Sequence, residues 1–225
     1  LALAQSLWCV EKPEYAIFLK SYLNYHEEYL TKHDVNFSKS IHYPELVIER
    51  AQNGINVGFK AASSDAHFDV ISQIAGSPEF DSHVTMSKDD FLFIERVSEG
   101  TDKEMSCKIQ SKDFKEVIEY TFTINSDLGI PIELITKPHP KYDHNGSLNL
   151  VDGIKGAIPW KGSEWLGFQE NEIELIIDLE KKEDVSLIEI GFLEDNGSWI
   201  YLPEQISTWV SADKNSWTQT DKTDI

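Results

Sequence analysis

The chain has 225 residues, 40% of them hydrophobic, and its 20 basic and 39 acidic side chains give a formal net charge of −19. This length can bury one large core or two smaller ones. The acidic surplus would repel a phosphate backbone, so we expect no nucleic-acid partner. Charged residues interrupt every apolar run before the ~18–20 residues of a membrane helix, so we expect no membrane span either.

The first forty residues show helical periodicity. In residues 13–33 apolar and aromatic side chains recur every three or four positions, which predicts one apolar helical face. That face comprises Tyr15, Phe18, Leu19, Tyr22, Leu23, His26, Tyr29 and Leu30. Pro13 suits the first turn of the helix, where its missing N–H is not needed. We predict an N-terminal helical segment over residues 1–40, whose apolar stripe packs either on the β-region that follows or on a partner outside this chain.

Residues 41–136 change to short runs of β-branched and aromatic residues. The runs are "LVIER", "INVGFKA", "FDVISQI", "FLFIERV", "MSCKIQ", "VIEYTFTI" and "IPIELI", with turn-rich segments between several of them. Asn53-Gly54 favours a tight hairpin with positive φ between the first two runs. About seven short strands at this spacing predict an Ig-like antiparallel β-sandwich over residues 41–136.

A stretch without periodicity follows the predicted sandwich. Its sequence, "TKPHPKYDHNGS", contains two prolines and one glycine and predicts a linker over residues 137–148. The later runs "IELIIDL", "VSLIEIGFL", "SWIYLP" and "ISTWVS" again have strand character. We therefore predict a mainly β protein with a second β-region over residues 149–225.

This second β-region resembles the F5/8 type C, or discoidin-like, modules of carbohydrate-binding family 32, which are galactose-binding-like jelly-roll sandwiches. The resemblance rests on "LVDG" at 150–153, "WLGF" at 165–168, the "IDL" strand, Pro203, and "SADKNSW" at 211–217, in that order. It implies a discoidin-like module. Such a module needs more residues than follow position 145, so the resemblance also implies that this one is partial, with an open sheet edge.

The front of the chain carries a second resemblance. "LALAQSLW" at 1–8 and the helix at 15–38 are similar to the last helical elements of the catalytic barrel in family 20 glycoside hydrolases, the β-N-acetylhexosaminidases. In many bacterial members a small β-sandwich and then a discoidin-like module follow the barrel. Gln5 departs from the family pattern, where Glu is common, and the middle region keeps only Gly76-Ser77-Pro78 of a typical family turn. This order of parts implies a barrel remnant at residues 1–40.

The resemblance also implies where catalysis takes place. Family 20 enzymes use an adjacent Asp-Glu pair: the acid protonates the leaving oxygen while the aspartate orients the substrate's acetamido group. No Asp in this sequence is followed by Glu, so we assign no catalytic residue to the chain. We expect a non-catalytic region whose partner is the catalytic barrel of its parent hydrolase. The parent is expected to be secreted or periplasmic, because its substrates are extracellular glycans.

Two kinds of binding site are candidates in the second β-region. Trp160 and Trp165 are of the residue type that stacks on a pyranose ring, and the alternative is that tryptophans near strand starts fill the end of a sandwich. Trp160, between Pro159 and Lys161, is expected to expose its ring. The resemblance further implies calcium at the Asp152-Gly153 turn, where Asn149 could assist.

Three functions remain open from the sequence. The first is a non-catalytic accessory region of a β-N-acetylhexosaminidase that supports the barrel and contacts glycans. The second is an autonomous carbohydrate-binding module, and the third is a protein-interaction or adhesion module without sugar affinity. Exposed rings on residues 15–30 would indicate a missing partner, whereas burial against the sandwich would favour an autonomous module.

Overall fold

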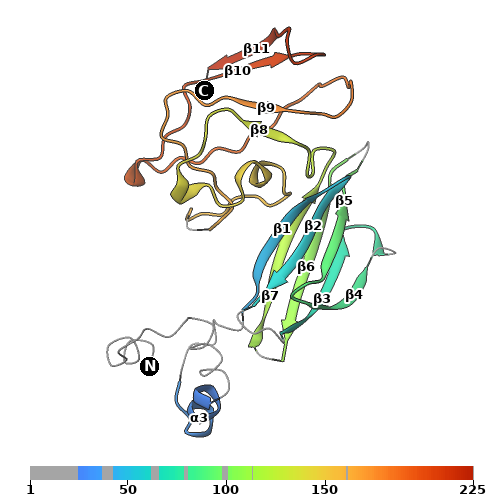
Figure 1. Ribbon diagram of the computed structural model, residues 1–225, viewed down its shortest axis with the longest axis vertical. Coiled ribbons are helices and arrows are strands. Elements are labelled where there is room, and N and C mark those ends of the chain that lie inside the picture. Colours follow the sequence, from blue (N-terminus) through green and yellow to red (C-terminus); the bar gives the residue numbers. More distant parts are fainter. Residues whose placement is uncertain are drawn as a thin grey trace.

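The computed structural model describes residues 25–36, 43–61, 66–78, 81–97, 101–112, 114–160 and 162–224. Within these ranges the chain is mainly β, with several antiparallel sheets and a few short helices (Figure 1). The predicted mainly β class is therefore confirmed. The predicted helix at residues 1–8 and the first part of the second one lie outside the described residues.

The helix α3 (Glu27–Lys32) is the described part of the predicted second helix. Its first turn holds Glu27 and Glu28 and its last turn holds Lys32, a charge order that complements the helix dipole. None of its residues is buried. Tyr25 and Tyr29, two nearby rings, are 71% and 59% exposed. Of the described members of the predicted apolar stripe, Tyr29 is exposed, whereas His26 and Leu30 are partly buried.

Two antiparallel sheets form the main body. The first sheet has the strand order β1-β2-β5 and the second has the order β4-β3-β6-β7. The first is built from β1 (Glu45–Ala51), β2 (Gly54–Lys60) and β5 (Phe91–Glu95). The second is built from β3 (His67–Ile74), β4 (Ser82–Ser87), β6 (Lys103–Ser111) and β7 (Phe114–Ile124).

One hydrophobic core joins the two sheets. Along β6 burial alternates with a period of two, as expected for a strand with one face on a core. The buried cluster draws side chains from both sheets, so the sheets pack face to face as a sandwich. Its largest fully buried side chains are Phe59, Phe68, Phe122, Ile55, Met86, Ile109, Leu128, Val57, Val70 and Cys107.

The hairpin between β1 and β2 confirms the tight turn predicted at this position. Ala51 pairs with Gly54, so Gln52 and Asn53 are the two loop residues. The positive φ falls on Gly54, at 147°, and not on Asn53. The Asn53 side chain is instead held outside the turn, since its Oδ1 accepts from Arg96 Nε at 2.9 Å.

Replacing Gly54 by alanine is expected to cost about 2 kcal/mol or more of the free energy of unfolding. A Cβ on Gly54 would overlap the carbonyl oxygen of Ile94 on β5, in addition to the unfavourable φ. Gly76 is the matched control, because its φ is 76° but no atom lies within 4 Å of its ideal Cβ. Urea denaturation of both variants separates steric overlap from φ strain, and equal losses would contradict the overlap.

Two smaller sheets follow the sandwich. Strand β8 (Ile132–Leu134) pairs with β9 (Leu175–Ile177), and β10 (Gln205–Val210) pairs with β11 (Thr218–Asp224), both antiparallel. The loop between β10 and β11 confirms the hairpin expected at "SADKNSW". In that loop the Asp213 carboxylate accepts from the backbone N–H groups of Asn215 and Ser216.

Four details of the strand prediction differ from the structure. The run "IPIELI" was predicted as a strand of the sandwich, but β8 pairs with β9, and β4, which was not predicted, lies in the sandwich. Strand β4 carries only Val84 and Met86 as apolar residues, so its pattern is weak. Residues 185–193 and 198–203 also have predicted strand character, but neither run forms a strand, and in the second only Ile200 makes an isolated bridge, to Asp195.

The predicted linker packs against the sandwich. It contains the 3₁₀ helix η4 (Pro140–Tyr142), and η5 (Gly146–Leu150) begins within it. Leu148 joins the sandwich core, and Asn145 Nδ2 donates to the carbonyl oxygen of Ile48 at 3.0 Å.

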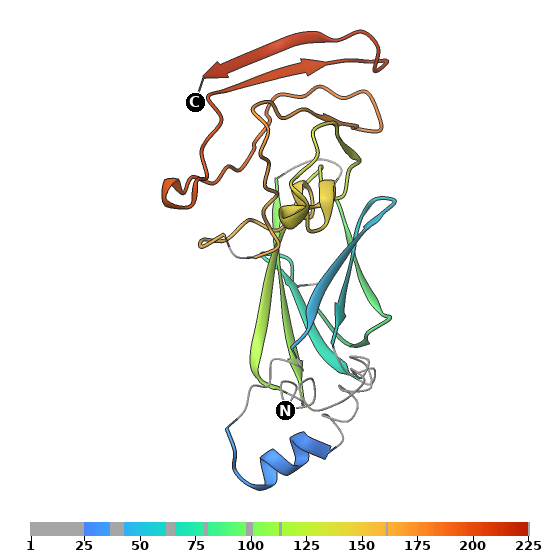
Figure 2. The ribbon, with the colours of Figure 1, turned by 60° about the vertical axis from the view of Figure 1, so that its left-hand side comes forward.

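Figures 1 and 2 place α3 and the β10–β11 hairpin at opposite ends of the sandwich.

Candidate functional site

The Asp152-Gly153 turn, a candidate from the sequence, is a buried turn against the end of β7. Asp152 is 5% exposed, and its Oδ1 accepts from the Ile154 N–H at 2.8 Å. Gly153 has a φ of 79°, and its carbonyl oxygen accepts from the Thr123 N–H at 2.7 Å. The predicted turn is therefore present, and its backbone is fixed to the sandwich.

Two further side chains with oxygen atoms belong to the same segment of the chain, residues 149–164. Asn149, also named from the sequence, is 9% exposed, and its Nδ2 donates to the carbonyl oxygen of Ser163 at 2.5 Å. Glu164 was not singled out from the sequence. Its Oε2 atom is buried and has no hydrogen-bond partner among the described residues. A Cβ on Gly162 would overlap this carboxylate, so the glycine leaves room for it.

The electrostatics of this acidic turn favour a cation. Burial raises the pKa of Asp152 to about 7, and the negative charge of Glu164 raises it further, against the opposing hydrogen bond from Ile154. Two carboxylates in a poorly hydrated place repel each other unless a proton or a cation lies between them. Repulsion between the ionised carboxylates of Asp152 and Glu164 therefore lowers the stability of the folded chain. A bound cation would remove this loss.

The oxygen atoms of Asp152, Asn149 and Glu164 are of the type that calcium binds. Calcium takes six to eight oxygen ligands, from carboxylates, amide and backbone carbonyls, and water. Asp152, Asn149 and Glu164 offer only oxygen donors once the Asn149 amide nitrogen is used by Ser163. In the described ranges no group of three or more His, Cys, Asp or Glu side chains could hold a metal ion, so carbonyls or water must complete any coordination here.

Trp160 is less exposed than we expected from its position in a polar loop. Its ring is partly buried and lies edge-on to Tyr142, with centroids 6.1 Å apart and planes at 79°. Its Nε1–H donates to Asp195 Oδ2 at 3.1 Å. The expectation of a freely exposed ring is therefore wrong: the indole joins the 160 loop to the 195 loop.

Trp165 is partly buried as well. Its Nε1–H donates to the carbonyl oxygen of Ala157 at 2.9 Å, and a Cβ on Gly156 would overlap its ring. Trp165 is thus a ring packed on its own loop. A role for either tryptophan in sugar binding stays a prediction.

Trp199 is the most exposed of the five tryptophans in the described ranges, at 82%. By residue type it is, like Trp160 and Trp165, a candidate for stacking on a sugar ring, with packing at a sandwich end as the alternative. The signal that could have singled it out is the turn-forming "DNGS" directly before it, which predicts that the next side chain projects from a tight turn. The structure places it at the C-cap of η6 (Asn196–Ser198).

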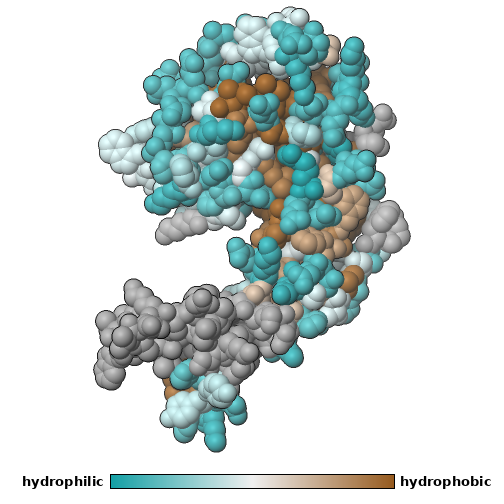
Figure 3. All heavy atoms as spheres, in the orientation of Figure 1, coloured by the Kyte–Doolittle hydropathy of each residue, from teal (hydrophilic) through white to brown (hydrophobic). Residues whose placement is uncertain are grey.

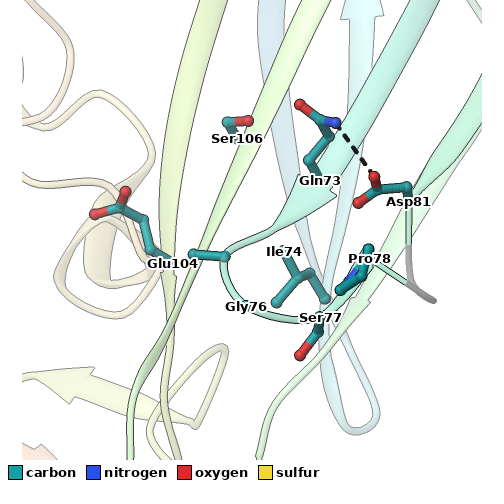
Figure 4. Close-up of a pocket in the computed structure, with 9 residues that line it drawn as sticks. Gln73, Ile74, Gly76, Ser77, Pro78, Asp81, Glu104 and Ser106 are labelled. Atoms are coloured by element: carbon teal, nitrogen blue, oxygen red, sulfur yellow. Dashed lines mark hydrogen bonds between the residues drawn. The ribbon is translucent and has the colours of Figure 1, made fainter.

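A shallow hollow of about 310 Å³ lies where β3 turns into β4, beside the start of β6. Figure 4 shows Gln73 bonded to Asp81 on one side, Ile74 and Pro78 on the floor, and Glu104 pointing away. The Gly76-Ser77-Pro78 turn that resembles the family turn forms part of its wall. The described residues that line this hollow offer an amide, hydroxyls and carboxylates but no aromatic ring on which a sugar could stack.

The described residues offer no reactive thiol. Burial raises the pKa of the Cys107 thiol to about 12, so it remains protonated at neutral pH in the core of β6. Cys9 lies outside the described residues. Cys107 therefore serves packing.

The fold and these sites define a mainly β protein of several antiparallel sheets, with a buried acidic turn and a group of ring-bearing loops beside it. No protein-family model matches the chain, and a search of curated proteins finds no match. In the part of the chain that the structure describes, no helix has the length and apolar character to cross a membrane.

Proposed function

We propose that this chain is a non-catalytic accessory region of a bacterial family 20 β-N-acetylhexosaminidase, which supports the catalytic barrel and contacts glycans. In this proposal the first sandwich is Ig-like, the C-terminal region is a partial discoidin-like jelly-roll, and the parent is secreted or periplasmic. The observation that carries the proposal is the pair of exposed rings, Tyr25 and Tyr29, at the described end of the N-terminal helical segment, because exposed rings on an amphipathic helix favour contact with another domain.

The C-terminal region supports the same proposal through its apolar surface. From Ile173 to Trp217 many large apolar side chains are at least about two-fifths exposed, and no described residue after Asp152 is buried. Figure 3 shows such side chains gathered on this part of the molecule. A sandwich of which only part is present would expose its inner faces in this way.

Glycan contact is supported by a row of rings on neighbouring loops. The rings of His139 and Tyr142 lie 5.7 Å apart, Tyr142 abuts Trp160, and Trp160 is bonded to Asp195. Lys141 Nζ lies 5.3 Å from the centre of the Tyr142 ring. Aromatic rings mixed with a carboxylate and hydrogen-bond donors form the kind of surface that binds carbohydrates.

Calcium would stabilise this region in the proposal. Asp152, Asn149 and Glu164 would hold the ion, which would neutralise the buried carboxylates and fix the loop from Asn149 to Glu164 against the sandwich. Its role is structural, because no reacting group lies beside it.

A glycan array and a chromogenic N-acetylglucosaminide together test the accessory function. We expect the chain to bind glycans and to leave the chromogenic substrate intact. Hydrolysis by the isolated chain would overturn the non-catalytic role. Failure to bind any glycan would favour a protein-interaction module.

Changing Tyr25 and Tyr29 together to serine is expected to leave the free energy of unfolding of this chain within about 0.5 kcal/mol, because exposed rings contribute little. Thermal melting followed by circular dichroism measures this. A loss of about 2 kcal/mol or more would mean that the rings pack on the sandwich, in favour of an autonomous module. The matched core control is Phe68→Ala, which alters a fully buried ring.

A further inference from the structure

Three asparagines in the sequence are each followed, two positions later, by a serine, which is the acceptor pattern of N-glycosylation. They are Asn36, Asn145 and Asn196, and the serine that follows Asn36 lies outside the described residues. Each of the three has an acidic residue two positions before it, whereas among the seven other asparagines only Asn215 has one. Bacterial oligosaccharyltransferases select this acidic residue as well as the serine, because a cationic group of the enzyme pairs with it.

Two of these acceptors form a matched pair within the described residues. They read "DHNGS" at 143–147 and "EDNGS" at 194–198, so both follow the pattern acidic-x-Asn-Gly-Ser. Each asparagine also lies at the start of a 3₁₀ helix, Asn145 as the N-cap of η5 and Asn196 as the first residue of η6. A difference in reactivity between them must therefore come from how the fold presents them.

The Asn196 acceptor lies on a projecting turn. Asp195 and Ile200 exchange two backbone hydrogen bonds, of 3.1 and 3.0 Å, which close the turn at its base. Figures 1 and 2 show the orange-red loop that carries η6 extending away from the sheets. The three side chains of the acceptor pattern, Glu194, Asn196 and Ser198, are all exposed.

The polar groups of this acceptor are bonded only within the turn. Asn196 Nδ2 donates to Glu194 Oε1 at 3.0 Å, and Ser198 Oγ donates to Asp195 Oδ2 at 2.7 Å. Surface hydrogen bonds of this kind contribute little net stability, so an enzyme can replace them without opening the fold. Asp195 also accepts from Trp160 Nε1 at 3.1 Å, which holds the turn in place meanwhile.

The same pattern at Asn145 is tied to the sandwich. Asn145 Nδ2 donates to the carbonyl oxygen of Ile48 at 3.0 Å, and both Asp143 and Ser147 are partly buried. Leu148, which directly follows this serine, is 8% exposed and joins the core. An enzyme could reach this acceptor only after η5 has left the core, which is a local unfolding step.

We propose that Asn196 is an N-glycosylation site, modified on the folded chain by a bacterial oligosaccharyltransferase. This proposal rests on the secreted or periplasmic location in the proposed function and adds a covalent modification to it. In the reaction the Asn196 amide nitrogen forms a bond to C1 of an oligosaccharide that is carried on a lipid diphosphate. The bond between C1 and the diphosphate oxygen breaks, the lipid diphosphate leaves with the electron pair, and one amide proton is released.

The test incubates the folded, unglycosylated chain with a purified bacterial oligosaccharyltransferase and a lipid-linked oligosaccharide. Mass spectrometry of proteolytic fragments measures how fast each asparagine gains the glycan. We expect Asn196 to be modified about ten-fold faster than Asn145 or more, because the Asn145 acceptor must first unfold locally. Synthetic peptides of residues 141–149 and 192–200 are the controls and should be modified at similar rates, since they share the pattern.

Two variants test the residues of the turn. Asn196→Gln should lose the modification at this position and keep the melting temperature of the unmodified chain. Glu194→Gln keeps an oxygen that accepts from Asn196 and removes only the charge. We expect this variant to be modified about ten-fold more slowly or less, because a charge-assisted pair with the enzyme is lost.

Every other outcome overturns a defined part. If both peptides are modified and Asn196 in the folded chain is not, the turn is inaccessible and the site is wrong. If Asn145 and Asn196 react equally in the folded chain, the fold does not select between them. If Glu194→Gln reacts like the unmodified chain, the acidic residue has no role, and if neither peptide reacts, the sequence is no acceptor. Glycan binding is measured separately on the array, so none of these results decides the proposed function.

Discussion

Replacing Phe59 by alanine is expected to lower the free energy of unfolding by about 3–5 kcal/mol. Phe59 lies on β2 and is fully buried between the two sheets. Its ring centroid is 6.3 Å from that of Phe68 on β3 and 6.2 Å from that of Tyr120 on β7. Truncation would therefore remove contacts with the opposite sheet and leave a cavity where they meet.

The matched control for Phe59 is Phe93, which lies on the adjacent strand β5 and is 50% exposed. Phe93→Ala should cost no more than about 1 kcal/mol, because the same ring is removed from a half-solvated position. Urea denaturation of both variants gives the comparison. Equal losses would show that the two sheets do not share the core described above.

The second large effect is expected at Asp152, where pH and calcium should act in opposite directions. The folded pKa is raised from 3.8 to about 7, so between these values the folded chain keeps a proton that the unfolded chain has released. The contribution of this group to stability is thus fully present below pH ~4 and is lost as pH rises to ~7. At ~1.4 kcal/mol per pKa unit, the loss is on the order of 4 kcal/mol.

Calcium should restore this stability at neutral pH, because it favours the ionised carboxylates of Asp152 and Glu164. At a concentration of about 100 times its dissociation constant, an ion that binds only the folded chain adds about 2.7 kcal/mol. The melting temperature should therefore rise with calcium at pH 7.5 and hardly at pH 4.5. Magnesium should act less, since it dehydrates reluctantly and demands a stricter geometry.

Asp152→Asn is the variant that tests both effects. An asparagine Oδ1 can still accept from the Ile154 N–H, so the turn is kept while the charge is removed. We expect this variant to be more stable than the unmodified chain at pH 7.5 without calcium and to gain little from calcium. If both proteins gain equally, calcium binds elsewhere, and if neither shows the fall in stability between pH 4 and 7, the carboxylate is not buried in solution.

Local patterns predicted much of the first β-region. The runs that became β1, β2, β3, β5, β6 and β7 carry β-branched and aromatic residues, and the β1–β2 hairpin followed from its turn residues. The Asp152-Gly153 turn and the "SADKNSW" hairpin were predictable for the same reason. Glycine favours turns through its backbone conformation, and Asp and Ser favour them through hydrogen bonds to backbone groups two or three residues away.

Which strands pair with each other could not be predicted from such local signals. The run containing β8 looks like any sandwich strand, yet β8 pairs with β9, about forty residues later. Residues 185–193 have strand composition and form no strand, because strand formation needs a neighbour that supplies hydrogen bonds. The role of Leu148, in a stretch that reads as a linker, depends on the space left at the end of the core.

The sequence by itself determined the mainly β class, the acidic charge and the turn at Asp152, all of which depend on composition or on neighbours in the chain. Only the tertiary structure decided that the charge of Glu164 acts on Asp152, that Trp160 bonds to Asp195, and that Trp199 is the most exposed tryptophan of the described ranges. These facts depend on contacts between loops that are far apart in the sequence. Such loops come into contact only after the sheets that carry them have packed.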